Sequence, residues 1–520
     1  MIRLICISAL VLLCLGKSGN LYGQVTQPYR YEQNIKNQNI DFTVISFGKN
    51  GLCLIQDLHT FEKTNKKWQV AVLDTTLAPV WAAEFGVPAR DVLAGFEYNS
   101  EYLYLLYRDG NTDFSDFNLL IINLNEKTIQ NHVIKFEVEL ALTHFTVAGQ
   151  SAVFGGYVNR EPAVLLYDPL THQSKILAGF FVKGIEILDV RANQNQSFNV
   201  LLINRNLKFL KKLILRNFDP LGKLILEDEI SIPEEINIIS GMTTSLVRDE
   251  LLIAGTYSST DRSTSVGIYS VNVNPFENQK INFTTYSSLY NFLNFLPPKH
   301  AERVKSQDIR RKEKGLLPIF KVYVNPIKIL ESPNGFYLLT EVYSPRDFYD
   351  TSNNPFFRDQ SNFFYPFNTP HYGYYSPRYN TLKKNYDMKM IQASIIKINS
   401  NAIPTRDISI PLENISRFNL RQVSDFTVVK DSIDIAFKIK NKIYFNTYKS
   451  ILNNNYSLSD TTLVSLAKLE KIRNELDDEG NILHWFNDSF YTWGYQSIDS
   501  YINNTKESRP VFYINRLRFR

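Results

Sequence analysis

Cysteine and histidine are scarce in this chain, and their scarcity excludes several classes of protein. Three cysteines and seven histidines occur among 520 residues. These numbers argue against a disulfide scaffold and against a cysteine-ligated zinc or iron–sulfur centre. Charged residues make up 21% and hydrophobic residues 44%. Both values are close to the average of globular proteins, which excludes a disordered chain and a polytopic membrane protein.

Local reaction signatures are absent as well. The sequence has no Gly-x-Ser-x-Gly, no His-Glu-x-x-His, no phosphate-binding loop and no dinucleotide fingerprint. We therefore expect no cofactor and favour a noncatalytic protein. Enzymatic activity stays open, because carboxylates brought together from distant parts of a chain leave no local motif.

An apolar run opens the chain. Residues 4–15 follow a positive charge at Arg3 and precede a small, polar stretch. About a dozen apolar residues are too few for a bilayer, which needs roughly 20. Residues 1–23 therefore indicate a cleavable signal peptide. The alternatives are a retained anchor and a lipoprotein with Cys14 as the lipid acceptor, although Leu13 stands where a small residue is usual.

The remaining chain has Cys53 as its single cysteine and no second apolar run of membrane-spanning length. An exported protein of this size without a disulfide is more typical of bacteria than of eukaryotes. We expect a protein of the periplasm, the outer-membrane surface or the medium, with no transmembrane span after signal cleavage.

Positive charge is concentrated in one segment. Residues 299–314 carry seven Lys and Arg against three Asp and Glu, whereas the whole chain has 57 against 52. Outside this segment and the leader the chain is close to neutral. Nucleic acid is therefore not an expected partner.

Strand-type segments recur at a regular step. The most apolar strand of each cluster begins at Cys53, Tyr102, Ala152, Asn199 and Leu251. A turn residue that follows the next strand keeps the same step, at Asp74, Asn123, Asp168, Asp219 and Asn274. Two landmarks that share a period of about fifty residues indicate an internal repeat.

One such repeat holds three or four strands, which are too few to bury both faces of their sheet. Radial stacking of the sheets solves this problem. Three further copies begin at Tyr337, Ile433 and Tyr491. The sequence predicts an all-β fold, a β-propeller of seven or eight blades that occupies residues 24–520 as one domain. We expect the terminal strand, VFYINRLRFR, to close the ring beside the first strand near Phe42. An irregular multi-sandwich protein is the alternative.

Two segments interrupt the repeat, and the first is residues 284–324. Apolar residues at helical spacing, followed by Pro297-Pro298 and the basic stretch, predict a short helical insertion. It is either a solvated helix docked through its apolar first half or an arm for an acidic partner or anionic surface. The candidate binding residues of such an arm are Lys305, Arg310, Arg311, Lys312 and Lys314.

The second interruption is residues 343–388. Aromatic side chains make up 13 of its first 37 residues, and five prolines argue against an ordinary strand or helix. The rings form either a satellite core or a recognition surface for an envelope protein or glycan. The candidate residues of that surface are Tyr349, Phe356, Phe357, Phe363, Phe364, Tyr365, Tyr372, Tyr374 and Tyr375.

A weak calcium-loop pattern lies at Asp109, Asn111 and Asp113. Phe114 stands where such a loop needs glycine, so we expect a polar hairpin loop and no metal.

The segments YNFLNFLPPKHAERVKSQDIRRKEKG, HYGYYSPRYN and KMIQASIIKINSNAIPTRD resemble those of a group of exported, propeller-like proteins of Bacteroidota. In that group a basic helix and a tyrosine-rich loop interrupt repeated β-hairpins. The resemblance covers residues 283–450 and implies compartment and architecture, not activity. The chain departs from the group's pattern at residues 401–404, where a glycine-containing turn is expected.

These features favour an exported, noncatalytic propeller that binds an envelope macromolecule, protein or glycan, as a recognition or assembly module. The alternative is a carbohydrate-active enzyme or glycan-binding protein that uses the aromatic loop together with carboxylates of the central channel. A purely structural subunit is a third hypothesis.

Overall fold

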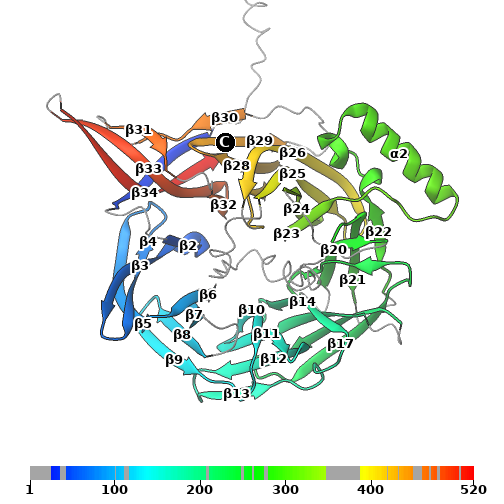
Figure 1. Cartoon of the computed structure of the whole chain (residues 1–520), viewed down its shortest axis with the longest axis horizontal. Helices are drawn as coiled ribbons and strands as arrows, with labels where there is room; N and C mark the ends of the chain where they lie inside the picture. The colour runs from blue at the N-terminus through cyan, green and yellow to red at the C-terminus, as the bar shows by residue number, and fades with distance from the viewer. Residues whose placement is uncertain are drawn as a thin grey trace, which may run out of the picture.

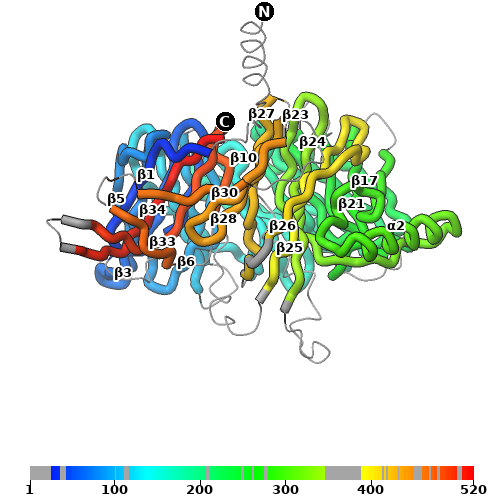
Figure 2. The backbone as a smooth tube through the Cα atoms, turned by 90° about the horizontal axis from the view of Figure 1, so that it is seen from above, coloured from blue at the N-terminus to red at the C-terminus, as the bar shows by residue number. Residues whose placement is uncertain are grey.

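Eight antiparallel sheets stand in a ring around a central axis in the computed structural model of the chain (Figure 1). After a turn of 90°, the ring is seen edge-on as a thick disc (Figure 2). The chain is therefore an eight-bladed β-propeller, which confirms the predicted fold class and decides the number of blades.

The structure describes residues 25–519 apart from short gaps. The gaps are 36–41, 100, 111–115, 206–209, 247–250, 260–262, 275–278, 347–386, 418–419, 431, 449–458, 466, 468–469, 477–480 and 503–504. The expected signal peptide and most of the aromatic segment lie outside the described residues. The one described α-helix is not long and apolar enough to cross a membrane.

The first four blades have four strands each, and the strands of each blade are named in order from the central axis outward. Blade 1 contains β2 (Phe42–Ser46), β3 (Leu52–Glu62), β4 (Asn65–Leu73) and β5 (Pro79–Pro88). Blade 2 contains β6 (Asp91–Tyr98), β7 (Tyr102–Asp109), β8 (Phe117–Asn123) and β9 (Thr128–Ile134). Blade 3 contains β10 (Ala141–Ala148), β11 (Ser151–Val158), β12 (Glu161–Asp168) and β13 (Gln173–Ile176). Blade 4 contains β14 (Ile185–Ala192), β15 (Phe198–Asn204), β16 (Lys212–Phe218) and β17 (Leu224–Ser231).

The last four blades vary more. Blade 5 contains β18 (Asn237–Ile238), β19 (Met242–Thr243), β20 (Leu251–Ser258), β21 (Gly267–Val273) and β22 (Asn282–Thr285). Blade 6 contains β23 (Tyr323–Ser332), β24 (Gly335–Arg346), β25 (Asp387–Ile398) and β26 (Pro404–Arg417). Blade 7 contains β27 (Ser424–Val429), β28 (Ser432–Ile439), β29 (Lys442–Tyr448) and β30 (Ser459–Thr462). Blade 8 contains β32 (Asn481–Phe486), β33 (Ser489–Ile502), β34 (Thr505–Phe519), β1 (Val25–Asn34) and β31 (Glu470–Glu475).

The predicted repeat corresponds to the blade. All eight repeat starts, from Cys53 to Tyr491, lie in the second strand of their blade. These strands are apolar on both faces because each has a sheet neighbour on either side and a packed blade above and below. In blades 1 to 4, the predicted turn residues end or directly follow the third strand.

The hydrophobic core is divided among the interfaces between blades. Eight apolar clusters are present, and each joins two neighbouring sheets around the ring. In the cluster between blades 8 and 1, for example, the rings of Phe42 and Phe512 stack with their centroids 4.0 Å apart. Each sheet therefore gives one face to each of two interfaces.

Polar contacts join the innermost strands of neighbouring blades. A β-bulge interrupts β6, β10, β14, β23 and β32. A bulge changes the direction of the side chain that follows it. After the bulge in β14, Asp189 accepts hydrogen bonds from the backbone N–H and the hydroxyl of Thr243 in blade 5, at 2.8 and 2.9 Å. After the bulge in β23, Lys328 pairs with Asp425 in blade 7.

The same position in blade 3 holds His144, which is buried beside blade 4. Its Nδ1 hydrogen-bonds the hydroxyl of Thr143 at 2.9 Å. Burial lowers the pKa of His144 to about 4, while Asp189 and a backbone hydrogen bond with Leu188 act in the opposite direction. The ring is therefore neutral in the folded protein at neutral pH.

We expect acidification to weaken the contact between blades 3 and 4. The unfolded chain binds a proton at His144 near pH 6.5, and the folded chain does so only near pH 4. The free energy of unfolding should therefore fall as the pH is lowered through these values, by on the order of 3 kcal/mol for this group. Urea titrations at several pH values should show this loss in the wild type relative to the His144→Gln variant. A difference between the two proteins that does not change with pH would contradict the assignment.

One tight turn recurs on the rim of the ring. In blades 1, 4 and 6 the Oδ1 atom of the turn residue accepts backbone N–H groups two and four positions later, and the residue three positions later has positive φ. The turn residues are Asp74, Asp219 and Asn399, and the positive-φ residues are Leu77, Gly222 and Ala402. The missing glycine at residues 401–404 thus does not change the turn, because Ala402 adopts the left-handed conformation.

Gly222→Ala should destabilise the protein by roughly 2–5 kcal/mol. An added Cβ would lie 2.5 Å from side-chain carbons of Leu166 and Leu177, at a φ of 76°. Left-handed backbone contributes about 1–2 kcal/mol of this loss and overpacking about 1–3. Gly48→Ala is the matched control, because Gly48 also has positive φ but has nothing within 4 Å of its added Cβ. Denaturant midpoints that fall equally in both variants would show that the contact with blade 3 is unimportant.

The first and the last of the described strands meet in blade 8. β34 pairs with β1, from Val25↔Phe519 to Asn34↔Val511. We expected β34 to close the ring beside the strand near Phe42. This prediction is wrong, because the strand that pairs with β34 is β1. Phe42 belongs to blade 1 and touches β34 only across the interface, through Phe512. A half-buried, largely polar strand such as β1 carries little apolar periodicity, so no local pattern marked it.

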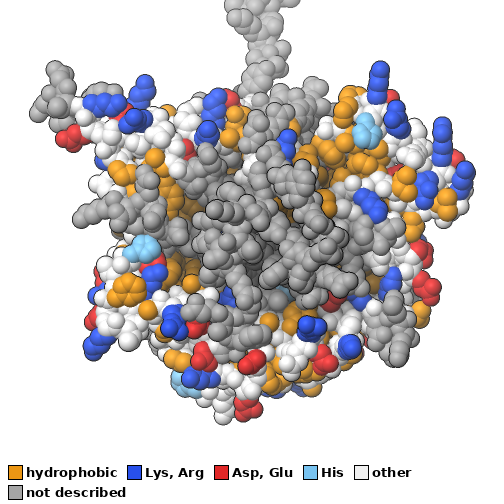
Figure 3. Space-filling model, viewed as in Figure 1, with side chains coloured by type: hydrophobic (Ala, Val, Ile, Leu, Met, Phe, Trp, Pro, Cys, Tyr) orange, Lys and Arg blue, Asp and Glu red, His pale blue; other side chains and the backbone are white. Residues whose placement is uncertain are grey.

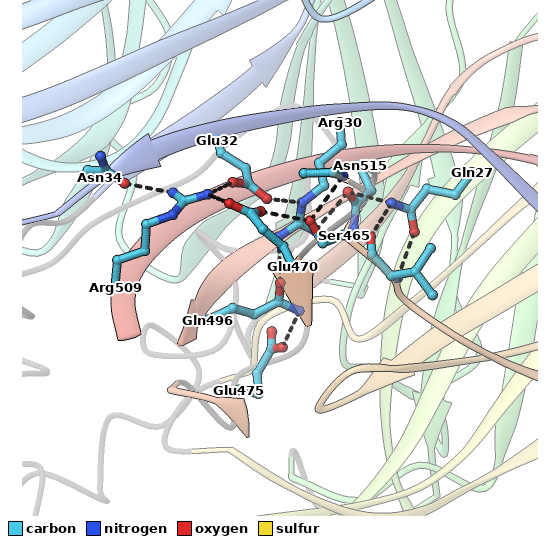
Figure 4. A network of polar contacts seen from close by, with 12 residues as sticks. Gln27, Arg30, Glu32, Asn34, Ser465, Glu470, Glu475, Gln496, Arg509 and Asn515 are labelled. Atoms are coloured by element: carbon cyan, nitrogen blue, oxygen red, sulfur yellow. Dashed lines mark hydrogen bonds and ion pairs between the residues drawn. The ribbon is translucent and has the colours of Figure 1, made fainter. Parts of the chain in front are cut away.

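A polar network holds this closure together (Figure 4). The guanidinium of Arg509 on β34 donates to Glu32 on β1 at 2.7 Å and to Glu470 on β31 at 2.8 Å. Arg30 on β1 donates to Gln496 on β33 at 2.7 Å. Gln496 in turn donates to Glu475 at 2.8 Å. The network therefore connects four strands of one blade.

The network ends in a buried ion pair with blade 7. Lys438 Nζ lies 2.6 Å from Glu475 Oε1, and their side chains are 0% and 1% exposed. The hydroxyl of Tyr513 donates to the same carboxylate oxygen at 2.6 Å. This carboxylate thus receives donors from both blades.

Lys438→Met should cost about 3–5 kcal/mol of unfolding free energy, because it leaves the charge of Glu475 buried without its counter-ion. The double variant Lys438→Met/Glu475→Gln should recover much of this loss. Lys442→Met is the control in the same blade, because the Lys442–Asp460 pair is about half exposed and worth less than about 1 kcal/mol. Equal effects of the two lysine substitutions in urea unfolding would refute a special role of the buried pair.

Candidate binding cleft beside blade 6

The helical insertion between blades 5 and 6 is part of the core. It contains the 3-10 turns η2 (Tyr286–Ser288) and η3 (Phe292–Phe295), followed by the helix α2 (Pro298–Glu313). The apolar first half, predicted as helical turns, is thus 3-10 rather than α-helical. Pro298 lies at the start of α2, where its missing N–H is not needed. Phe292 and Leu293 are buried in the cluster between blades 5 and 6.

A buried carboxylate fixes η3 to the outermost strand of blade 6. Asp407 on β26 accepts the backbone N–H groups of Tyr290 and Asn291 at 2.7 and 2.9 Å. The side chain of Asn291 donates to the backbone oxygen of Asp407 at 2.7 Å. Burial raises the pKa of Asp407 to about 6, against the effect of the backbone donors and of Lys305. These bonds set the distance between η3 and the sheet.

Buried polar side chains continue from this junction into blade 6. Gln392 on β25 is 2% exposed, and its Nε2 donates to the backbone oxygen of Phe292 at 2.8 Å and to Ser394 Oγ at 3.0 Å. Ser394 and Ser409 share a hydrogen bond of 2.9 Å between neighbouring strands. A fixed row of amide and hydroxyl groups therefore lies under η3.

A cleft of about 790 Å³ is present where η3 meets β24, β25 and β26. Its lining contains the hydroxyls and amides of this junction, one lysine and several apolar side chains. The lining residues are Asn294, Phe295, Ser344, Lys389, Met390, Ile391, Gln392, Ser409, Pro411 and Leu412. No Asp or Glu occurs among these described lining residues.

The cleft lies beside the ends of the two strands that carry the aromatic segment. β24 ends at Arg346 and β25 begins at Asp387, and these two residues pair with each other. Tyr343, expected as the first residue of the loop, is instead a buried residue of β24. Pro345 pairs with Met388 of β25 but lies beyond the end of the pairing with β23, so it stands at an edge position of the sheet that tolerates proline. All nine candidate aromatic residues, from Tyr349 to Tyr375, lie outside the described residues.

The candidate basic residues all lie on or just after α2, and two of them bond the fold. Lys305 Nζ donates to the backbone oxygen of Tyr290 at 3.3 Å. Arg311 Nε donates to the backbone oxygen of Leu317 at 2.7 Å. Arg310, Lys312 and Lys314 are exposed. Lys305 and Arg311 therefore help to hold the insertion in place, whereas the other three cations are exposed to solvent.

The remaining chemical candidates do not form a site among the described residues. No group of three or more His, Cys, Asp or Glu that could hold a metal occurs in the part of the chain that the structure describes. Asp109 ends β7, and Asn111 and Asp113 lie outside the described residues. Two buried carboxylates of innermost strands are hydrogen-bonded to the next blade. Asp189 accepts the backbone N–H of Thr243, and Asp425 accepts the backbone N–H of His484 at 2.7 Å.

Sequence reasoning missed the cleft itself. The segment Gln392–Ser394 interrupts an apolar strand with two polar residues at buried positions, and that interruption was the available signal. Buried polar side chains require partners, so they mark a place where another segment must arrive.

No protein-family model matches the chain, and no curated protein matches it in sequence. Among solved structures, the chain is similar to the β-propeller domain of the trilobed protease from Pyrococcus furiosus, with 8% identity over 80% of this chain and 97% of that one and a TM-score of 0.33. It is also similar to the polysaccharide lyase Uly1, with 6% identity, 84% and 91% coverage and a TM-score of 0.38. An ulvan lyase of polysaccharide lyase family PL25 gives 8% identity, 80% and 90% coverage and a TM-score of 0.38. These similarities concern the propeller fold and carry no argument about activity.

Proposed function

We propose that this protein is an exported, noncatalytic propeller that binds a glycan of the cell envelope in the cleft beside blade 6. The composition of the cleft supports this proposal. Its volume lies within the range of about 300–1,000 Å³ that is typical of ligand sites. The amide of Asn294 and the hydroxyl of Ser344 match the hydroxyl groups of a sugar, and the ring of Phe295 offers an apolar surface to its C–H face.

Two further features refine the ligand. Lys389 is the one charged residue among the described lining residues, so an acidic sugar is favoured over a neutral one. Glycoside hydrolysis needs a pair of carboxylates, and the described lining contributes neither. This supports binding over cleavage. The aromatic segment begins and ends beside the same cleft, which supports a contribution of its rings to the same ligand.

The first test is a substitution in the cleft. Lys389→Gln should weaken binding of acidic oligosaccharides about tenfold or more, because it removes the charge-assisted contact. Lys397→Gln, at the opposite end of β25, is the matched control. An array of acidic and neutral oligosaccharides, followed by calorimetry on those that bind, measures both variants. Equal affinity of the two variants would contradict the cleft assignment, and shortened products in the mixture would favour the carbohydrate-active enzyme.

The paired residues Arg346 and Asp387 allow a clean removal of the aromatic segment. Replacing residues 347–386 by Asn-Gly should form a two-residue hairpin without a change of register. If the rings contribute to recognition, this variant keeps its thermal stability and loses oligosaccharide binding. Retained binding would restrict the site to the cleft.

A further inference from the structure

One face of α2 carries a row of cations. Val304 and Asp308, which are 6% and 8% exposed, define the side that packs on the propeller. At 3.6 residues per turn, Lys299, Arg303, Arg310 and Lys314 lie within about 60° of one another on the opposite side. All four are exposed. With a rise of about 1.5 Å per residue, the row is about 22 Å long.

The charge of this face is only partly balanced. Glu302 and Glu313 are the exposed acidic residues of the helix, whereas Asp308 is buried beneath it. Lys312 is a fifth exposed cation, about half a turn around the helix from the row. The solvent-exposed surface of α2 therefore carries a net positive charge.

Exposed aliphatic side chains accompany the cations. Ile309 on the helix is 59% exposed, and Leu316 and Ile319 just after it are 49% and 46% exposed. The segment after the helix folds back on its last turn, because the backbone N–H of Leu316 donates to the backbone oxygen of Arg311 at 2.9 Å. By the helical angle Ile309 lies about 80° from Lys299, so exposed aliphatic groups flank the row of cations near the end of α2.

We propose that this face of α2 binds the surface of an anionic lipid bilayer. The helix projects from the rim of the ring, so that it can meet a flat surface (Figures 1 and 2). Lys and Arg side chains are prominent over it in the space-filling view (Figure 3). The aliphatic side chains favour a bilayer over an acidic polypeptide, because they can enter the boundary between headgroups and acyl chains while the cations stay among the headgroups. The proposal does not depend on the glycan cleft.

Vesicle sedimentation tests the proposal. The chain that begins at Val25 retains all eight sheets and lacks the apolar leader, which would itself bind lipid. It should sediment with vesicles of phosphatidylglycerol and phosphatidylcholine, should not sediment with phosphatidylcholine alone, and should be released by high salt. Each basic residue near an anionic surface contributes about 1 kcal/mol, or a factor of about five, so Arg303→Gln/Arg310→Gln should weaken partitioning roughly 30-fold.

Lys49→Gln/Arg90→Gln is the control, because it removes the same charge from exposed positions in the turns of blade 1. Equal partitioning of this variant and the α2 variant would overturn the proposal, and so would equal sedimentation with neutral vesicles. Selective binding of polyglutamate at α2 without binding to anionic vesicles would also overturn it and would indicate an acidic protein partner. A loss confined to the α2 variant, with unchanged binding of oligosaccharides, would support it.

Discussion

The burial of apolar surface between neighbouring sheets is the constraint on which the rest of this molecule depends. A four-stranded sheet that is apolar on both faces cannot be stable alone in water. Each of the eight sheets therefore needs two neighbours, and the requirement is met for all of them only when the ring is closed. The eight separate apolar clusters are the direct expression of this constraint, since each belongs to one interface.

The same constraint explains why the insertion before α2 is structural in its first half. Blade 5 has a short, divided innermost strand, formed by β18 and β19. Its interface with blade 6 takes additional apolar side chains from η2 and η3, among them Tyr286 and Phe292, whose rings stack with centroids 4.0 Å apart. Because η3 must be held against the sheet, buried polar groups such as Asp407 and Gln392 are needed at the junction. The cleft lies at this junction, where η3 meets the strands of blade 6.

Periodicity of the sequence was enough to predict the repeat, because the second strand of each blade is apolar throughout and an Asp or Asn often ends the third strand. Both signals are local. The partner of β34 was not predictable, because pairing between residues almost 500 positions apart leaves no local pattern and β1 alternates weakly. The 3-10 form of η2 and η3 was missed because apolar spacing at three and four residues fits both kinds of helix. The cleft combines β24, β25 and β26 with a segment about 100 residues earlier, so its polar residues had meaning only once their partners were known.

The pairing of β1 with β34 also sets an order of events in the life of the chain. During synthesis β1 precedes the other strands of the ring, and its partner β34 follows all of them. Until then blade 8 has no outer strand, and the apolar faces of blades 7 and 1 that should cover it stay open. The ring consequently gains its last interface only after the strands of all eight blades have been made.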